Sequence, residues 1–99
     1  MHYTLDRGDY PEEPTISEMT AKAIRLLQKG SQGYFLMVEG ALIDNAHHKN
    51  NAANALHETI AMAEAVKAAD DLTENQNTLL LGTVANKGTT RIDLRNFLH

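Results

Sequence analysis

The stretch GYFLMVEGALIDNAHHKN, residues 33–50, changes in its middle from apolar residues to a segment with acidic residues and histidines. It decides how the rest of the chain is interpreted. It opens with YFLMV, residues 34–38, an apolar run that is too short for a helix. Such a run is typical of a strand buried on both faces, as in a parallel sheet. Residues 39–48 are predicted to form a loop, and this loop carries two carboxylates and two imidazoles, Glu39, Asp44, His47 and His48.

A helix is predicted before this strand. TISE, residues 15–18, has the form of a capping box, with a hydroxyl at the N-cap and a glutamate three residues later. Apolar residues then recur on one helical face, at Met19, Ala23, Leu26 and Leu27. Lys29 and Gly30 end the helix, because a cation suits the last turn and glycine tolerates the left-handed conformation.

A helix and a second strand are predicted after the loop. Residues 49–72 are rich in alanine and form a long helix, with one apolar face made of Ala53, Leu56, Ile60 and Ala63. Residues 77–84 form the second buried strand. Strand, helix and strand in this order predict a parallel βαβ unit with a right-handed crossover. Since two strands cannot complete a parallel sheet, we expect an α/β chain that forms part of a larger sheet.

Composition narrows the function classes. With 99 residues, the chain is the size of one small domain. A net charge of −4 without any basic run argues against nucleic acid as a partner. The chain has no cysteine, so a transition-metal site would have to use histidine and carboxylate ligands. No stretch has the roughly 20 apolar residues of a membrane helix, and residues 1–14 contain no apolar signal core.

The polar residues after the first strand are the candidate site. Ligand sites of open α/β sheets lie beyond the carboxyl ends of the strands. Asp44 and His48, four residues apart, could both reach one zinc ion, and Glu39 would suit a neighbouring ion that prefers oxygen, such as magnesium. Spacing alone favours a different interpretation, in which Asp44 caps the long helix and His47 and His48 are solvated residues of its first turn.

Residues 1 to about 83 resemble the alkaline phosphatase family. The segments that carry the resemblance are MHYTLDR, PTISEMTAKAIRLLQK, GYFLMVEGALIDNAHH, ALHETIAMAEAVKAADDLT and NTLLLGT. The resemblance implies a fragment of a three-layer α/β sandwich, in an enzyme that hydrolyses phosphate monoesters with two zinc ions and one magnesium ion. Members of this family are usually homodimers and are commonly secreted or anchored at the cell surface.

The resemblance assigns roles to residues of the candidate site. Glu39 stands where the family has a magnesium ligand. Asp44 and His48 stand where it has two of the three ligands of one zinc ion. His47 matches a variable position next to these ligands and is expected at most to support them. His57, on the long helix, matches no residue with a family role and is expected to be a surface or packing histidine.

The resemblance stops near Thr83. The family continues there with T-A-D-H, whose Asp and His bind the second zinc ion, whereas this chain continues with VAN, residues 84–86. We therefore expect a partial alkaline phosphatase domain in residues 1–83 and a divergent tail in residues 84–99. The nucleophilic serine and the phosphate-clamping arginine of the family have no counterpart here, so we expect these 99 residues alone to be inactive. The alternative is a non-catalytic truncated product that binds metal weakly or acts as an interaction fragment.

Overall fold

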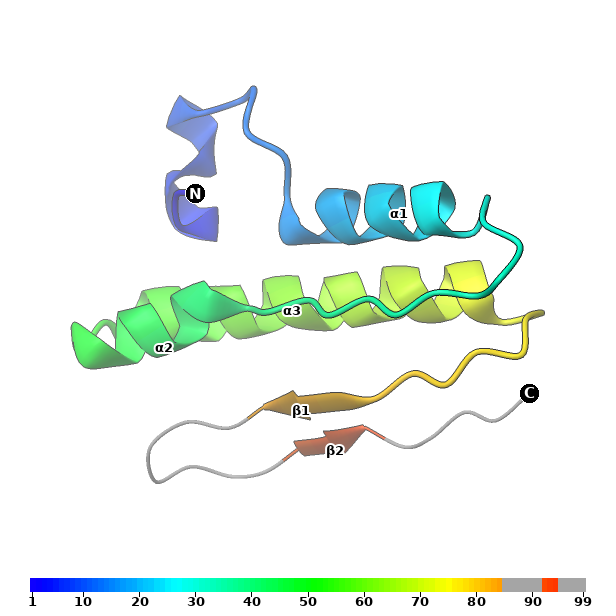
Figure 1. Ribbon diagram of the computed structural model, residues 1–99. Coiled ribbons are helices and arrows are strands. Elements are labelled where there is room, and N and C mark those ends of the chain that lie inside the picture. The colour runs from blue at the N-terminus through cyan, green and yellow to red at the C-terminus, as the bar shows by residue number, and fades with distance from the viewer. Residues whose placement is uncertain (85–91, 95–99) are drawn as a thin grey trace.

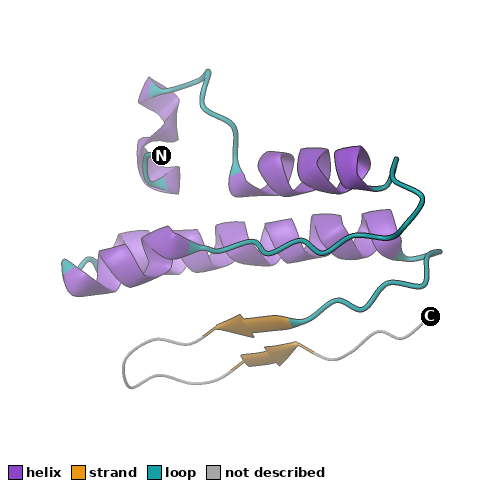
Figure 2. Cartoon of the chain, viewed as in Figure 1, coloured by secondary structure: helices purple, strands orange, loops and turns teal. Residues whose placement is uncertain are grey.

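The computed structural model of the chain describes residues 1–84 and 92–94, and these residues form mainly helices (Figures 1 and 2). The elements in chain order are η1 (Thr4–Asp9), α1 (Ile16–Leu27), α2 (Ala41–His48), α3 (Ala52–Thr73), β1 (Gly82–Val84) and β2 (Ile92–Leu94). The long helix α3 is the centre of the arrangement, because η1, α1 and α2 all pack against it.

Helix α1 begins at the predicted capping box. The Glu18 N–H donates to the Thr15 hydroxyl over 3.0 Å, and the Thr15 N–H donates to the Glu18 carboxylate over 2.7 Å. Two backbone donors that a helix start leaves free are thereby satisfied. The prediction of a helix start at this point is confirmed.

The predicted apolar faces of α1 and α3 are wrong. Met19 and Leu26 of α1 and Leu56 and Ile60 of α3 are exposed. The residues buried between the helices are smaller on average: Ile16, Thr20 and Ile24 from α1, and Ala61, Ala65 and Ala69 from α3. Alanine and threonine allow two helices to approach closely, so the contact follows the small residues. On α3 the largest apolar side chains therefore do not mark the contact face, whereas on α1 the contact face includes Ile16 and Ile24.

The predicted parallel βαβ unit is absent from residues 1–84 and 92–94, so the α/β expectation is corrected. Residues 34–38 run extended along α3, but they have no strand partner among the described residues (Figure 1). Of the second predicted strand, only β1 forms, and it pairs antiparallel with β2, with Thr83 opposite Asp93. An apolar run can favour an extended chain, but hydrogen bonding into a sheet needs a neighbouring strand. The remaining residues of the proposed tail, 85–91 and 95–99, lie outside the described part of the chain.

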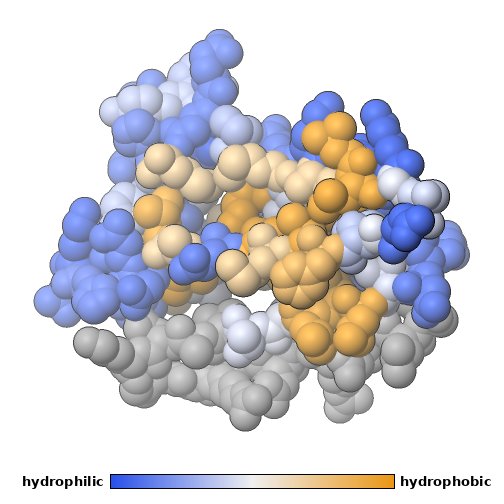
Figure 3. All heavy atoms as spheres, viewed as in Figure 1, coloured by the Kyte–Doolittle hydropathy of each residue, from blue (hydrophilic) through white to orange (hydrophobic). Residues whose placement is uncertain are grey.

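The extended segment alternates in exposure like a strand. Tyr34, Leu36 and Val38 are partly buried, and Val38 packs against the cluster of Ile16, Ala61 and Ala65. Phe35 and Met37 point outward, with 89% and 76% of their surface exposed. Figure 3 shows that apolar side chains gather in the middle of this face of the molecule. The segment is thus held by side-chain packing on one face only.

Glu13 joins the two ends of the N-terminal segment. Its carboxylate lies 2.7 Å from the His2 ring nitrogen Nδ1 and accepts the His2 backbone N–H over 2.8 Å. The hydrogen bond with the His2 side chain is the main reason why the pKa of Glu13 falls from 4.5 to about 2. A pKa that is lower in the folded chain stabilises the fold above the unfolded-state pKa, and this contribution disappears as the pH falls toward the folded-state value.

We therefore predict that Glu13→Gln lowers the thermal midpoint at pH 6 and that its difference from the wild type shrinks as the pH falls from 4.5 to 2. Thermal unfolding followed by circular dichroism across this range measures the difference. Glu12→Gln, which removes the neighbouring exposed carboxyl, is the control. A wild-type-minus-Glu13→Gln difference that stays constant with pH would contradict the prediction.

Candidate metal-binding helix

Helix α2 brings Asp44 and His48 together. Residues four apart lie on the same face of a helix, and the Asp44 carboxylate oxygen Oδ2 is 3.1 Å from the His48 ring nitrogen Nε2. Both side chains are more than half exposed, at 59% and 58%. The predicted loop over residues 39–48 is wrong for residues 41–48, and the helix that replaces it creates the close pair.

Three contacts hold α2 in place. Ile43 and Ala46 are the buried residues of this helix, which packs on α3. Gly40 precedes the helix, and a Cβ atom there would lie only 3.3 Å from the Met62 sulfur of α3. At the other end, the Asn50 N–H donates to the His47 carbonyl over 3.0 Å, and the Asn51 N–H donates to the Ala46 carbonyl over 2.9 Å. These two bonds form a Schellman motif, which ends α2.

His47 makes a different contact from its neighbour. Its ring nitrogen Nδ1 is hydrogen-bonded to the Ile43 carbonyl of the preceding turn over 2.7 Å. The ring is therefore tied to the backbone of its own helix. The expectation that His47 supports the ligand pair stays a prediction, since this bond neither requires nor excludes it.

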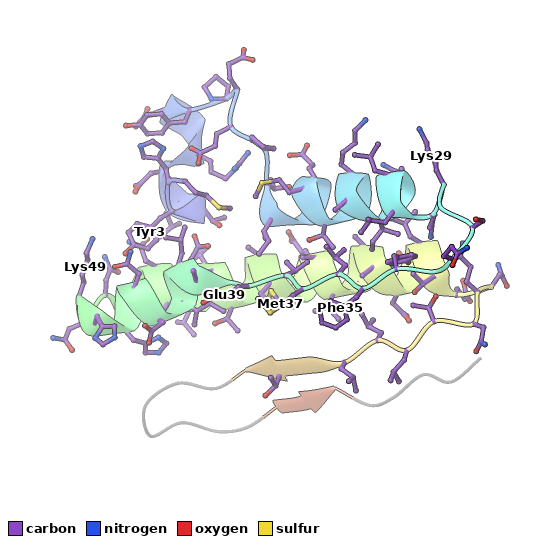
Figure 4. The ribbon with its side chains drawn as sticks, in the orientation of Figure 1. Tyr3, Lys29, Phe35, Met37, Glu39 and Lys49 are labelled. Carbon is purple, nitrogen blue, oxygen red and sulfur yellow. The ribbon has the colours of Figure 1, made fainter. Side chains whose placement is uncertain are left out.

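Glu39 is exposed at the end of the extended segment, where the chain enters α2 (Figure 4). Within the described ranges, no three side chains of histidine, aspartate or glutamate lie close enough to hold one metal ion. The structure thus joins two of the three predicted ligands, Asp44 and His48. The assignment of Glu39 to a separate ion stays a prediction.

The geometry of the pair suits one divalent ion. Zinc binds imidazole nitrogen and carboxylate oxygen at about 2.0–2.2 Å, so two tetrahedral ligands lie about 3.4 Å apart. The observed 3.1 Å between Asp44 and His48 is close to this spacing. Because both groups are exposed, an ion bound here would keep coordination positions open to further ligands.

Sequence reasoning missed the junction between α2 and α3. Asn50 adopts a positive φ of 53°, and the Asn51 side chain accepts the Asn54 N–H over 3.0 Å as the N-cap of α3. Asparagine is among the few non-glycine residues that enter the left-handed region readily, and it is also a preferred N-cap. Two consecutive asparagines, separated from His48 only by Lys49, were therefore an available signal for a helix end followed by a helix start.

Comparison with known proteins shows similarity to one family. A family profile described as alkaline phosphatase matches residues 1–92. The chain is 47% identical over 83 residues to the tissue-nonspecific isozyme of alkaline phosphatase from Gallus gallus. The matched region covers 84% of this chain and 16% of that protein. It is 47% identical to the membrane-bound alkaline phosphatase of Bombyx mori, over 84% of this chain and 15% of that protein. The human tissue-nonspecific isozyme is 42% identical, over 84% of this chain and 16% of that protein.

The chain thus spans about 16% of the length of the curated relatives it matches. No solved structure matches it. None of the helices in the described ranges is both long and apolar enough to cross a membrane.

Proposed function

The chain belongs to the alkaline phosphatase family, and from this premise we propose that Asp44 and His48 bind a zinc ion of a site for phosphate monoester hydrolysis. The observation that carries the proposal is the 3.1 Å separation of the carboxylate oxygen and the imidazole nitrogen, because it is close to the spacing of two zinc ligands. The exposure of both groups supports it as well, since a substrate phosphate must reach the ion.

Glu39 is proposed as a ligand of a separate magnesium ion. Magnesium prefers oxygen ligands, keeps several bound waters and is usually held by only one or two carboxylates. An exposed carboxylate at the end of an extended segment suits such a role, because water and other ligands can complete the coordination. Glu39 also lies only two residues before α2, the helix that carries Asp44 and His48.

The proposed role of Asp44 and His48 is to bind the zinc ion and to fix its position. When bound, zinc acts as a Lewis acid and lowers the pKa of coordinated water. Asp44 supplies a negative charge that offsets part of the charge of the ion, and α2 holds His48 at a fixed spacing from it. Because the resemblance provides no nucleophilic serine within residues 1–99, we propose metal binding as the property of this chain. Hydrolysis of phosphate monoesters is proposed only for the complete site of the family.

Zinc titration of the purified chain tests the proposal. We expect Asp44→Ala and His48→Ala each to weaken zinc binding by about tenfold or more, since even residues that only orient ligands cost 10- to 100-fold. His57→Ala is the matched control, because His57 is an exposed histidine of α3 whose ring is hydrogen-bonded to the Ala53 carbonyl. Isothermal titration calorimetry gives the affinities.

Two outcomes would contradict this account. If Asp44→Ala and His48→Ala bind zinc as tightly as the His57→Ala control and the wild type, the pair is not a zinc site. If the chain, supplied with zinc and magnesium, hydrolyses a chromogenic phosphate monoester and Asp44→Ala abolishes this turnover, then the chain is catalytically competent and binding alone is too narrow a proposal.

A further inference from the structure

We propose that Asn50 is a positioning residue that fixes His48 relative to Asp44. His48 is the last residue of α2, and Asn50 lies two residues beyond it. The inference concerns the geometry of the last turn of α2, and its consequence for zinc affinity rests on the proposed function.

Helix α2 is too short to hold its own last turn. It has eight residues, whereas isolated helices shorter than about 12–15 residues are marginal in water. Of its two buried residues, Ile43 lies in the first turn and Ala46 in the last turn, whereas His48 itself is exposed and is not held by packing. The bonds that follow the helix are therefore a second anchor of its last turn, beside the burial of Ala46.

One of these two bonds depends on the backbone conformation of Asn50. The Asn50 N–H donates to the His47 carbonyl before the chain reverses, and the Asn51 N–H then reaches back to the Ala46 carbonyl because Asn50 has a φ of 53°. Both acceptors belong to the last turn of α2, the turn that carries His48. Closing this turn keeps His48 one helical turn above Asp44, at the observed 3.1 Å.

The junction also sets the direction of α2 relative to α3. Directly after the reversal, the Asn51 side chain caps α3 by accepting the Asn54 N–H. Two residues thus end one helix and begin the next, with no further residue between the two motifs. A residue that resists a positive φ at position 50 would disturb the end of α2 and the start of α3 together.

The test compares variants that tolerate or resist this conformation. Valine is β-branched and resists a positive φ, whereas glycine adopts it freely. We expect Asn50→Val to weaken zinc binding by about tenfold, in line with residues that orient ligands, and to reduce the helical Cα chemical shifts of residues 44–49 in the metal-free chain. Asn50→Gly should keep both the affinity and the shifts.

Gly33→Val is the matched control for backbone strain. Gly33 also has a positive φ, 78°, but it is exposed, and a Cβ there would meet no atom within 4 Å. This variant should lower the urea midpoint of unfolding about as much as Asn50→Val while keeping zinc affinity and the shifts of residues 44–49. A merely structural role of Asn50 would make the two variants behave alike in all measurements.

The inference is overturned if Asn50→Val keeps the helical shifts of residues 44–49, or if Gly33→Val loses them to the same degree. Failure of the proposed function is a separate result. If the wild type binds no zinc, the zinc site is refuted, and the chemical shifts of the metal-free variants still decide whether Asn50 holds the last turn.

Discussion

Ala65→Leu is expected to lower the free energy of unfolding by about 1–3 kcal/mol, the usual range for overpacking of a well-filled core. Ala65 is 1% exposed and lies in the cluster with Ile16 and Ala61, between α1 and α3. A leucine at this position would have to separate the two helices or adopt a strained rotamer. Urea unfolding followed by circular dichroism measures the loss.

Ala63→Leu is the matched control for this variant. It makes the same substitution in the same helix, but Ala63 is exposed. Alanine and leucine have similar helix propensities, so this change should alter the free energy of unfolding by less than about 0.5 kcal/mol. Equal losses in the two variants would show that α1 and α3 are not packed closely around Ala65.

Glu58→Ala is expected to release η1 from α3 and to lower the free energy of unfolding by about 1.5–3 kcal/mol, the range for hydrogen bonds to charged groups. Glu58 is buried, at 6% exposure, and its carboxylate accepts the backbone N–H of Thr4, the first residue of η1. This bond joins residues 54 positions apart in the sequence. Without it, the Thr4 N–H loses its partner and the side chain of residue 58 no longer fills the contact.

Glu58→Gln separates the hydrogen bond from the charge. The glutamine amide oxygen can still accept the Thr4 N–H, so this variant should retain most of the contact that Glu58→Ala loses. Glu64→Ala, at an exposed position of the same helix, controls for the loss of a carboxylate from α3. Urea unfolding and the amide exchange rate of Thr4 are the measurements. Indistinguishable values for Glu58→Ala and Glu64→Ala would refute the role of Glu58.

The local signals in the sequence predicted the helices better than their packing. Thr15 and Glu18 bond to each other's backbone within four residues, so the start of α1 needs no tertiary partner. The long alanine-rich helix is likewise confirmed as α3. The face that each helix buries depends on how closely its neighbour approaches. Small residues allowed that approach here, and the exposed Leu56 and Ile60 had suggested the wrong face.

The prediction of two paired parallel strands was wrong for a related reason. Residues 34–38 have the side chains of a buried strand and adopt an extended backbone, yet pairing depends on a second segment that local pattern cannot supply. For the site, the spacing of Asp44 and His48 predicted that the two could share an ion, and the helix confirms that they are close. Asn50 and Asn51 also carried a signal for a helix end and a helix start, but the prediction of a loop over residues 39–48 left that signal unused.

Buried and exposed side chains alternate along residues 34–38, and all five side chains are apolar. Hydrophobicity alone therefore determines only weakly how this segment is aligned against α3. Since apolar residues occupy both faces, a slip by one residue would exchange Phe35 and Met37 for Tyr34, Leu36 and Val38 at little cost in buried apolar area. The adjoining glycines remove this ambiguity. A slip would place a side chain where Gly40 lies against Met62, and would move a non-glycine residue into the positive φ of Gly33. Backbone requirements at the two ends thus select one register that the side chains between them would not select alone.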